Sequence, residues 1–213
     1  MKLMIGICTR GNDLYYKLFD WLMPYINQPK IPTEIVLQLS PYAASYGQKR
    51  LFNYAVERDV DYLLMVDSDI GPPVDCLTQM LFHKKDIITI PIWHCDDLRH
   101  DIHYNVSRVG DTDVGSRLYS RGSGLERIKS ASFGILLINR NVLRKFVEKG
   151  ESFVEWSPLI EEKYKQQQTD MIFFLKADKL GIESYVDWDV TGAIHSRVVE
   201  LCDKTIENIR NKR

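Results

Sequence analysis

The chain has 213 residues, of which 45% are hydrophobic and 27% are charged, as in ordinary soluble globular proteins. At about 150 residues per domain, this length predicts one domain, alone or with a small added lobe, whose core needs no disulfides. The 28 Lys and Arg residues nearly balance the 29 Asp and Glu residues, so the net charge is -1. This balance excludes a strongly basic nucleic-acid coat and an acidic disordered chain.

The sequence carries no targeting or membrane-spanning pattern. Its first apolar run is too short for a signal peptide, and no run approaches the roughly 20 apolar residues of a transmembrane helix. The four cysteines lie far apart and form no Cys-x-x-Cys pair. We therefore expect free thiols in a cytoplasmic protein without a membrane span.

Strands and helices alternate along the first half of the sequence. Short apolar runs predict strands at residues 3–9, 34–40, 61–66 and 86–93. Helical spacing of apolar residues predicts helices at residues 14–26, 48–58 and 73–84. The alternation predicts an α/β domain with a mostly parallel central sheet and helices on both faces. Ligands of such sheets bind beyond the carboxyl ends of the strands.

The second half is less regular. Residues 94–123 are polar and predict a long loop or a small hairpin. The elements expected after them are two strands within 125–139, helices at 141–149 and 169–180, a strand at 183–188, a short segment at 193–195 and an amphipathic helix at 198–209. Thr169 is a candidate N-cap, and Gly181 follows the end of its helix. We expect the basic residues 210–213 to be solvated at a helix end, with contact to an anionic acceptor as the alternative.

Asp67-Ser68-Asp69 is the one Asp-x-Asp pattern of four that ends an apolar strand in the predicted sheet. Two carboxylates at a strand end are costly to hold together unless a positive charge lies between them. Their oxygens suit Mg²⁺ or Mn²⁺. The alternative is that both aspartates only cap the following turn. Asp170 at a helix start and the lone His195 also have ordinary structural explanations when each is taken alone.

These residues belong to an ordered series of motifs over residues 3–195. The series comprises Thr9-Arg10-Gly11 at a strand end, the segment 61–70 around Asp67, the segments 124–128 and 132–140, the helix start Thr169-Asp170, and His195. In this order the sequence resembles small glycosyltransferases of the GT-A fold, family 2 in particular. The resemblance implies a single GT-A-like, Rossmann-related domain, with a nucleotide-binding half at 1–93, an acceptor-binding half at 94–195 and a C-terminal helix at 196–213.

The resemblance implies a metal-dependent glycosyltransferase and a role for each motif residue. A UDP- or GDP-sugar would be bound by Thr9, Arg10, Gly11, Asp67 and Ser68. Mn²⁺ or Mg²⁺ would be held by Asp67, Asp69 and His195. Asp170 matches the aspartate that is general base for the acceptor hydroxyl in inverting members, and the sequence leaves open whether transfer inverts or retains the configuration. The chemistry agrees, because the leaving diphosphate gains charge, the anomeric carbon becomes oxocarbenium-like and the acceptor must lose a proton.

Two positions depart from the family pattern. The Glu of the family's Glu-Asp pair is Thr169 here. The position where relatives commonly carry an Arg is Gln48, with Lys49 and Arg50 beside it. Arg50 is therefore the candidate cation for the nucleotide.

The acceptor is expected to contact residues 93–134 and 152–170, or a second subunit in a homodimer. Trp93 and Trp156 are candidate sugar-stacking surfaces, with core packing as their alternative, and Phe133 and Gly134 are further candidate acceptor or sugar contacts. The acceptor class stays open: a glycan, a protein, a small molecule or a modified nucleic-acid base. Scattered cations such as Arg117, Arg121 and Arg127 could meet an anionic acceptor.

Three alternatives remain. A cluster at His94, Cys95, Asp96, Asp97, His100, Asp101 and His103 contains metal-ligand residue types. It could serve a zinc- or iron-dependent hydrolase, although its spacing fits no structural zinc site and a solvated loop is the simpler interpretation.

The second alternative is a nucleotidyltransferase of similar layout, which the short loop after the first strand disfavours. The third is a non-catalytic nucleotide- or sugar-binding module.

Overall fold

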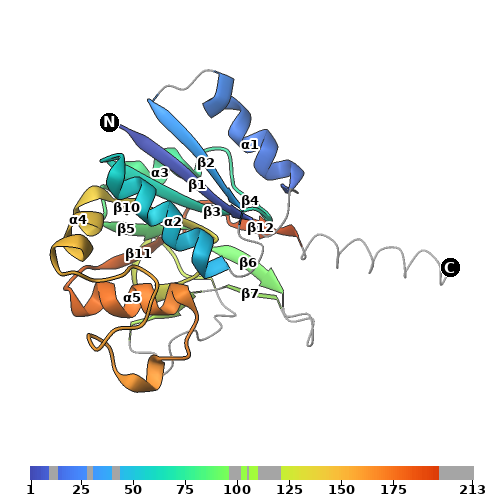
Figure 1. The fold of residues 1–213 in the computed structure, drawn as a ribbon. Helices are drawn as coiled ribbons and strands as arrows, with labels where there is room; N and C mark the ends of the chain where they lie inside the picture. Colours follow the sequence, from blue (N-terminus) through green and yellow to red (C-terminus); the bar gives the residue numbers. More distant parts are fainter. Residues whose placement is uncertain are drawn as a thin grey trace.

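The computed structural model describes residues 1–9, 14–27, 31–39, 44–95, 102–104, 106–109 and 121–196. In this part of the chain, an eight-stranded sheet is covered by helices on both faces, and a four-stranded sheet lies beside one end of it (Figure 1). The predicted α/β class with a mostly parallel sheet is confirmed, and residues from both halves of the sequence build the larger sheet.

Six strands of the large sheet run in one direction. The order is β2 (Thr33–Leu39), β1 (Leu3–Thr9), β3 (Tyr62–Asp67), β10 (Ile135–Asn139), β5 (Ile87–Thr89), β11 (Ser184–Asp187), β9 (Leu125–Ala131) and β8 (Val106–Arg108). The pairs β1–β2, β1–β3 and β5–β11 are parallel, whereas β10 and β9 run antiparallel to both of their neighbours. The carboxyl ends of β1 and β3 therefore meet at one edge.

Alternation along the central strands divides the core into two clusters, one on each sheet face. In β3, Leu63 and Met65 pack into one cluster, and Leu64 and Val66 into the other, because successive side chains point to opposite faces. Three helices cover the first face: α2 (Ala44–Glu57), α4 (Arg140–Glu148) and α5 (Thr169–Lys179). The other face is covered by α1 (Tyr16–Asn27) and α3 (Cys76–Phe82). A short 3₁₀ helix, Glu162–Tyr164, precedes α5.

The predicted strand at 86–93 is divided into two strands that belong to different sheets. After β5, the chain passes through Pro91 into β6 (Ile92–Cys95), which joins the four-stranded sheet. Pro91 has no N–H to donate, while its carbonyl accepts from the backbone N–H of Ala193 at 2.9 Å. The order of the smaller sheet is β4 (Ile70–Gly71), β12 (Ala193–His195), β6 and β7 (Ile102–Tyr104). This sheet brings His195 beside Ile70, next to the Asp-x-Asp segment.

Other boundaries differ from the sequence expectation by a few residues. Helix α2 begins at Ala44, before the expected residue 48, and α3 begins at Cys76, after the Pro72-Pro73 pair. In the polar stretch 94–123, β6 and β7 pair as antiparallel strands.

The predicted helix 198–209 and the basic residues 210–213 lie outside the described residues, as do Arg117 and Cys202. No helix in the described ranges is long and apolar enough to cross a bilayer. Cys8 and Cys76 are both buried, and Sγ of Cys8 donates to the carbonyl of Ala44 at 3.6 Å.

A buried ion pair ties α5 to the segment before it. The side chain of Lys176 is fully buried, and its Nζ lies 2.8 Å from Oε2 of Glu151. The same ammonium donates to the carbonyl of Ser152 at 2.8 Å, and the hydroxyl of Ser157 donates to Glu151 at 2.6 Å. Because both charges have a partner, this network fixes residues 151–157 against α5.

Replacing Lys176 with methionine is expected to lower the free energy of unfolding by about 3–5 kcal/mol, because it leaves the Glu151 carboxylate without its buried partner. Urea denaturation measures the change. Lys179→Met, at an exposed position of the same helix, is the matched control. Loss of less than about 1 kcal/mol in Lys176→Met, equal to the control, would show that the ion pair does not hold this segment.

Candidate active site

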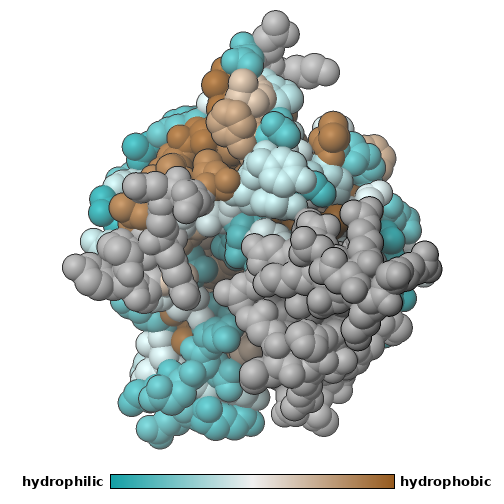
Figure 2. Space-filling view, turned by 90° about the vertical axis from the view of Figure 1, so that its right-hand side faces the viewer, coloured by the Kyte–Doolittle hydropathy of each residue, from teal (hydrophilic) through white to brown (hydrophobic). Residues whose placement is uncertain are grey.

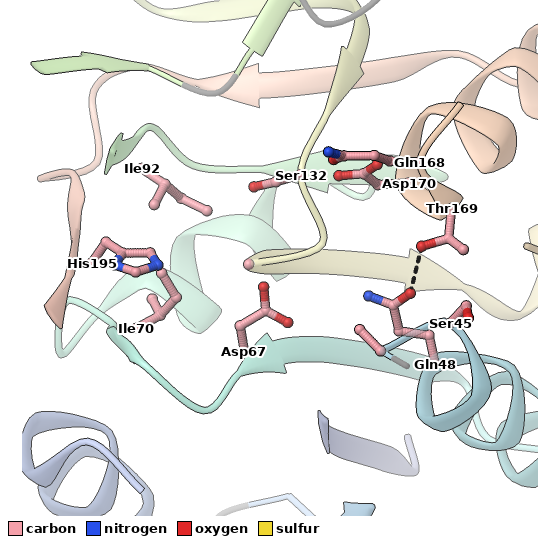
Figure 3. A pocket seen from close by; sticks show the side chains of 12 residues that line it. Ser45, Gln48, Asp67, Ile70, Ile92, Ser132, Gln168, Thr169, Asp170 and His195 are labelled. Carbon is pink, nitrogen blue, oxygen red and sulfur yellow. Dashed lines mark hydrogen bonds between the residues drawn. The ribbon is translucent and has the colours of Figure 1, made fainter. Parts of the chain in front are cut away.

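A cavity of about 490 Å³ opens at the carboxyl ends of β1 and β3. Its lining combines side chains from α2, β3, the β9–β10 connection, the start of α5 and β12 (Figure 3). The lining residues are Ala44, Ser45, Gln48, Asp67, Ile70, Ile92, Ser132, Gly134, Gln168, Thr169, Asp170 and His195. Figure 2 views the molecule from the side on which these strands end, where hydrophilic and hydrophobic residues are mixed. The site thus lies where the α/β topology predicts one.

One end of the cavity is lined by Asp67 and His195, and Asp69 lies next to His195 outside the lining. Asp67 is the last residue of β3 and points into the cavity in Figure 3. Nε2 of His195 lies 3.1 Å from Oδ2 of Asp69, and the backbone N–H of Ser196 donates to the Asp69 carbonyl at 2.8 Å. Residues that are far apart in sequence are therefore brought together here.

Asp170 lies on the opposite side of the cavity from His195, in the first turn of α5 (Figure 3). Burial raises the pKa of its carboxyl group to about 6, although backbone N–H groups, that of Met171 at 2.8 Å among them, oppose the rise. The helix dipole also favours the ionised form, so desolvation outweighs two opposing effects. A carboxylate with a pKa near 6 is largely ionised at neutral pH and is still basic enough to accept a proton.

The two positions that depart from the family pattern contact each other. The hydroxyl of Thr169 donates a hydrogen bond to Oε1 of Gln48 at 2.7 Å, which joins α5 to α2 (Figure 3). The expected N-cap role of Thr169 is therefore wrong, because Gln168 is the N-cap and Thr169 is the first helical residue. The neutral bond fixes the residue next to Asp170 without adding a charge at this end of the cavity.

Thr169→Val and Gln48→Leu are expected to show coupled effects on stability. Each single change leaves one polar partner unpaired, at a cost of about 1–3 kcal/mol, whereas the double variant removes both partners and should cost less than the sum. Urea unfolding of the four proteins measures the coupling, with Thr78→Val at an exposed site as the control. Strict additivity would show that the hydrogen bond contributes nothing.

The remaining predicted nucleotide contacts that the structure describes are not among the side chains that line the cavity. Thr9 is buried at the end of β1 and is absent from the cavity lining, while Arg10 and Gly11 lie outside the described residues. The backbone carbonyl of Ser68 accepts from Tyr15 N–H at 2.9 Å. Arg50 does not line this cavity; its guanidinium donates to the hydroxyl of Tyr54. Gln48, two residues earlier, lines the cavity together with Ala44 and Ser45 of the same helix.

The predicted acceptor contacts divide in the same way. Gly134 lines the cavity, and a Cβ there would come within 2.8 Å of Cδ1 of Ile92, so glycine keeps this wall open. The ring of Phe133 is 2% exposed and packs between Phe52 and Phe173, so the ring itself belongs to the core. Trp93 is 36% exposed and lies against Tyr104.

Trp156 lies away from the cavity lining. It is half-buried in the segment before α5, and the ammonium of Lys165 lies 5.2 Å from its ring centroid. Of the predicted cations, Arg121 donates to the carbonyls of Trp188 and Val190, and Arg127 pairs with Glu183. These arginines have structural partners within the described chain.

The acidic end offers oxygen and imidazole donors to a divalent cation. Among the described residues, no three His, Cys, Asp or Glu side chains gather closely enough to form a complete metal site. Mg²⁺ and related cations at nucleotide sites commonly take one or two carboxylates and fill their remaining positions with phosphate oxygens and water. The Asp69–His195 pair beside Asp67 fits that partial donor set.

The rival cluster at residues 94–103 is described only in part. His94 and Cys95 belong to β6 and pair in register with His103 and Ile102 of β7, and the side chain of His103 is buried. Asp96, Asp97, His100 and Asp101 lie outside the described residues, as do the side chains of His94 and Cys95.

Sequence reasoning missed six lining residues, namely Ala44, Ser45, Ile70, Ile92, Ser132 and Gln168. Ser132 and Ile70 are direct neighbours of predicted site residues, so proximity in sequence could have suggested them. Ser45 and Ile92 reach the cavity only because α2 starts early and because the chain turns at Pro91.

Comparison with known proteins gives structural likeness only. No protein-family model matches the sequence, and no curated protein matches it. The structure is similar to A197 from STIV, with a TM-score of 0.59 and 16% identity over 92% of this chain and 85% of that one. It is also similar to UDP-glucose pyrophosphorylase complexed with UDP-glucose, with a TM-score of 0.50 and 14% identity over 100% of this chain and 82% of that one. GalNAc-T7 with UDP, GalNAc and Mn²⁺ follows, with a TM-score of 0.49 and 10% identity over 92% of this chain and 44% of that one. The first two likenesses show a shared fold.

Proposed function

We propose that the protein is a glycosyltransferase that moves a sugar from a nucleotide-sugar donor to an acceptor hydroxyl. One observation carries the proposal: a single cavity holds Asp67 and His195, paired with Asp69, at one end and the raised-pKa carboxylate of Asp170 at the other. In this arrangement the diphosphate would bind at the Asp67–His195 end, and Asp170 would accept a proton at the other end. The resemblance to GT-A family 2 enzymes and the likeness to a UDP-glucose complex support a nucleotide sugar as donor.

In this proposal the acidic end receives the diphosphate. Asp67, Asp69 and His195 would hold Mn²⁺ or Mg²⁺, which when bound would offset the negative charge that the leaving nucleoside diphosphate gains. Asp67, at the tip of β3, would orient the donor sugar so that its anomeric carbon faces the Asp170 end. The predicted loop at residues 9–11 would contribute to the nucleotide site from the neighbouring strand end.

Asp170 acts as the general base on the acceptor. Its carboxylate takes the proton of the acceptor hydroxyl while the oxygen forms a bond to the anomeric carbon. The bond between that carbon and the diphosphate oxygen breaks, and the nucleoside diphosphate leaves with the electron pair. Attack from the side opposite the leaving group inverts the configuration of the transferred sugar.

A nucleotidyltransferase is the second candidate, which the likeness to UDP-glucose pyrophosphorylase favours. In that reaction a sugar phosphate attacks a nucleoside triphosphate, and its oxygen is already ionised. A buried carboxylate with a pKa of about 6 would then have no proton to accept, so Asp170 favours glycosyl transfer.

Incubation with a panel of UDP- and GDP-sugars and Mn²⁺ tests the proposal. We expect slow release of UDP or GDP from one donor without acceptor, through transfer of the sugar to water. This result identifies the nucleobase and the sugar of the donor. If no donor releases nucleoside diphosphate, with or without a mixture of saccharide and peptide acceptors, the glycosyltransferase proposal is wrong.

A further inference from the structure

A second groove of about 340 Å³ adjoins the cavity along α2. Its lining residues are Ser45, Tyr46, Lys49, Arg50, Asn53, Val154 and Glu155. Ser45 lines both the groove and the cavity, so the two hollows share a wall. A molecule in the cavity could therefore extend into the groove without leaving the protein surface.

Helix geometry explains how one helix serves both hollows. Ala44 and Gln48, four residues apart, face the cavity. Ser45, Lys49 and Asn53 follow the same spacing along the adjacent stripe, and Tyr46 and Arg50 form a second stripe beside it. Val154 and Glu155 form the opposite wall. They belong to the segment that the Lys176–Glu151 pair fixes against α5, which also carries Asp170.

The charges in the groove leave one cation in excess. Nζ of Lys49 lies 2.6 Å from Oε1 of Glu155, so these two charges offset each other across the groove. Arg50 instead contacts phenols: it donates to the hydroxyl of Tyr54 and lies 5.9 Å from the ring centroid of Tyr46. Within the described ranges, Arg50 has no acidic partner among the ion pairs of the structure. A guanidinium in this state is suited to bind a carboxylate or a phosphate through two hydrogen bonds.

Tyr46 adds a surface for a sugar ring. Its side chain is 57% exposed although it lines the groove, and it follows Ser45, which lines both groove and cavity. An aromatic face can pack against the apolar face of a pyranose, while the neighbouring polar groups, Asn53 and Ser45, can bond to hydroxyls. The groove therefore combines a ring-stacking surface with a cation about one helical turn further on.

We propose that this groove is an acceptor subsite that binds an anionic group, a carboxylate or a phosphate, carried by a saccharide. The inference rests on the proposed function and specifies its acceptor class. The groove adjoins the Gln48–Thr169 contact and the segment before α5, on the side of the proton-accepting Asp170. The acidic Asp67–His195 end, assigned to the diphosphate, lies across the cavity (Figure 3). This position assigns Arg50 to the acceptor rather than to the nucleotide.

Direct binding of three probes tests the subsite without any turnover: methyl glucuronide, glucose 6-phosphate and methyl glucoside, titrated by NMR. We expect at least one acidic probe to bind about tenfold more tightly than the neutral glucoside. Arg50→Gln should remove that preference, Arg50→Lys should restore only part of it, and Tyr46→Ala should weaken acidic and neutral sugars alike. Arg144→Gln, an exposed arginine on α4, is the matched control.

Each outcome has a consequence. Preference for the glucuronide identifies a carboxylate, and preference for the phosphate identifies a sugar phosphate; both support the subsite. Equal binding of acidic and neutral probes, no saturable binding of either acidic probe, or an unchanged preference in Arg50→Gln would overturn it. Weaker Mn²⁺-dependent UDP or GDP binding in Arg50→Gln would place Arg50 at the nucleotide and also overturn it. The donor panel fails or succeeds independently, because the probe titration involves no donor.

Discussion

Asp170→Asn is expected to remove transfer and, in the same variant, to stabilise the protein. Loss of a general base lowers the rate by about 10²–10⁴-fold, while the amide keeps the shape of the carboxyl group. Binding of UDP or GDP with Mn²⁺ should persist, since Asp170 lies at the opposite end of the cavity from Asp67 and His195. Transfer from the donor found in the panel measures the loss of activity. Binding of UDP or GDP measures whether the nucleotide site is retained.

The stability gain follows from the direction of the pKa change. The folded protein raises the pKa of Asp170 from 3.8 to about 6, so folding favours the protonated form. The contribution of this group to stability is complete below about pH 4 and is lost as the pH rises through 6. At pH 7, the free energy of unfolding of Asp170→Asn should therefore be about 1–3 kcal/mol higher than that of the wild type. The wild-type transfer rate should fall as the pH drops below 6.

Asp178→Asn, at an exposed position of the same helix, is the control for both measurements. Transfer at the native rate by Asp170→Asn would show that Asp170 is not the base. Loss of transfer together with a loss of stability would instead show that Asp170 is a structural residue of α5.

Asp69→Ala is expected to give the second largest effect, on metal-dependent nucleotide binding. Removing a charged ligand weakens binding by about tenfold or more, and losing charge stabilisation of the leaving group lowers transfer by about three orders of magnitude. Titration calorimetry with UDP and GDP, in Mn²⁺ and in EDTA, separates binding from turnover. Asp69 also pairs with His195, so His195→Ala should weaken nucleotide binding in the same direction.

The control is Asp75→Ala, an exposed aspartate at the start of α3, outside the cavity lining. Equal nucleotide affinity of wild type and Asp69→Ala in Mn²⁺ would contradict the metal role. An affinity that does not change between Mn²⁺ and EDTA in the wild type would contradict it as well.

The alternation of strands and helices could be predicted because it follows from local patterns. The runs that became β1 and β3 are continuously apolar, as expected of strands buried on both faces. The division of 86–93 into β5 and β6 could not be predicted from hydropathy, since both pieces are apolar. It depends on Pro91, whose carbonyl pairs with β12, a contact with a segment about 100 residues further along the chain.

The site was predictable where a residue follows a strand or opens a helix. Asp67 and Asp170 were found this way, because the end of a buried strand and the first turn of a helix have fixed directions. Arg50 does not line the cavity, because residues two apart on a helix point about 200° apart, and only the packing of α2 shows that Gln48 faces the cavity. Phe133 was assigned from its place in a motif, whereas its ring fills the core.

The most direct test of the central claim is to determine which bond the protein breaks. The wild-type protein is incubated with its donor nucleotide sugar and Mn²⁺, and in parallel with the matching nucleoside triphosphate and sugar 1-phosphate, and both UDP or GDP and pyrophosphate are quantified. We predict that the wild-type protein releases nucleoside diphosphate from the sugar nucleotide and forms no pyrophosphate. We predict that Asp170→Asn does not release nucleoside diphosphate. Pyrophosphate release from the triphosphate, with activity retained in Asp170→Asn, would contradict glycosyl transfer and identify a nucleotidyltransferase.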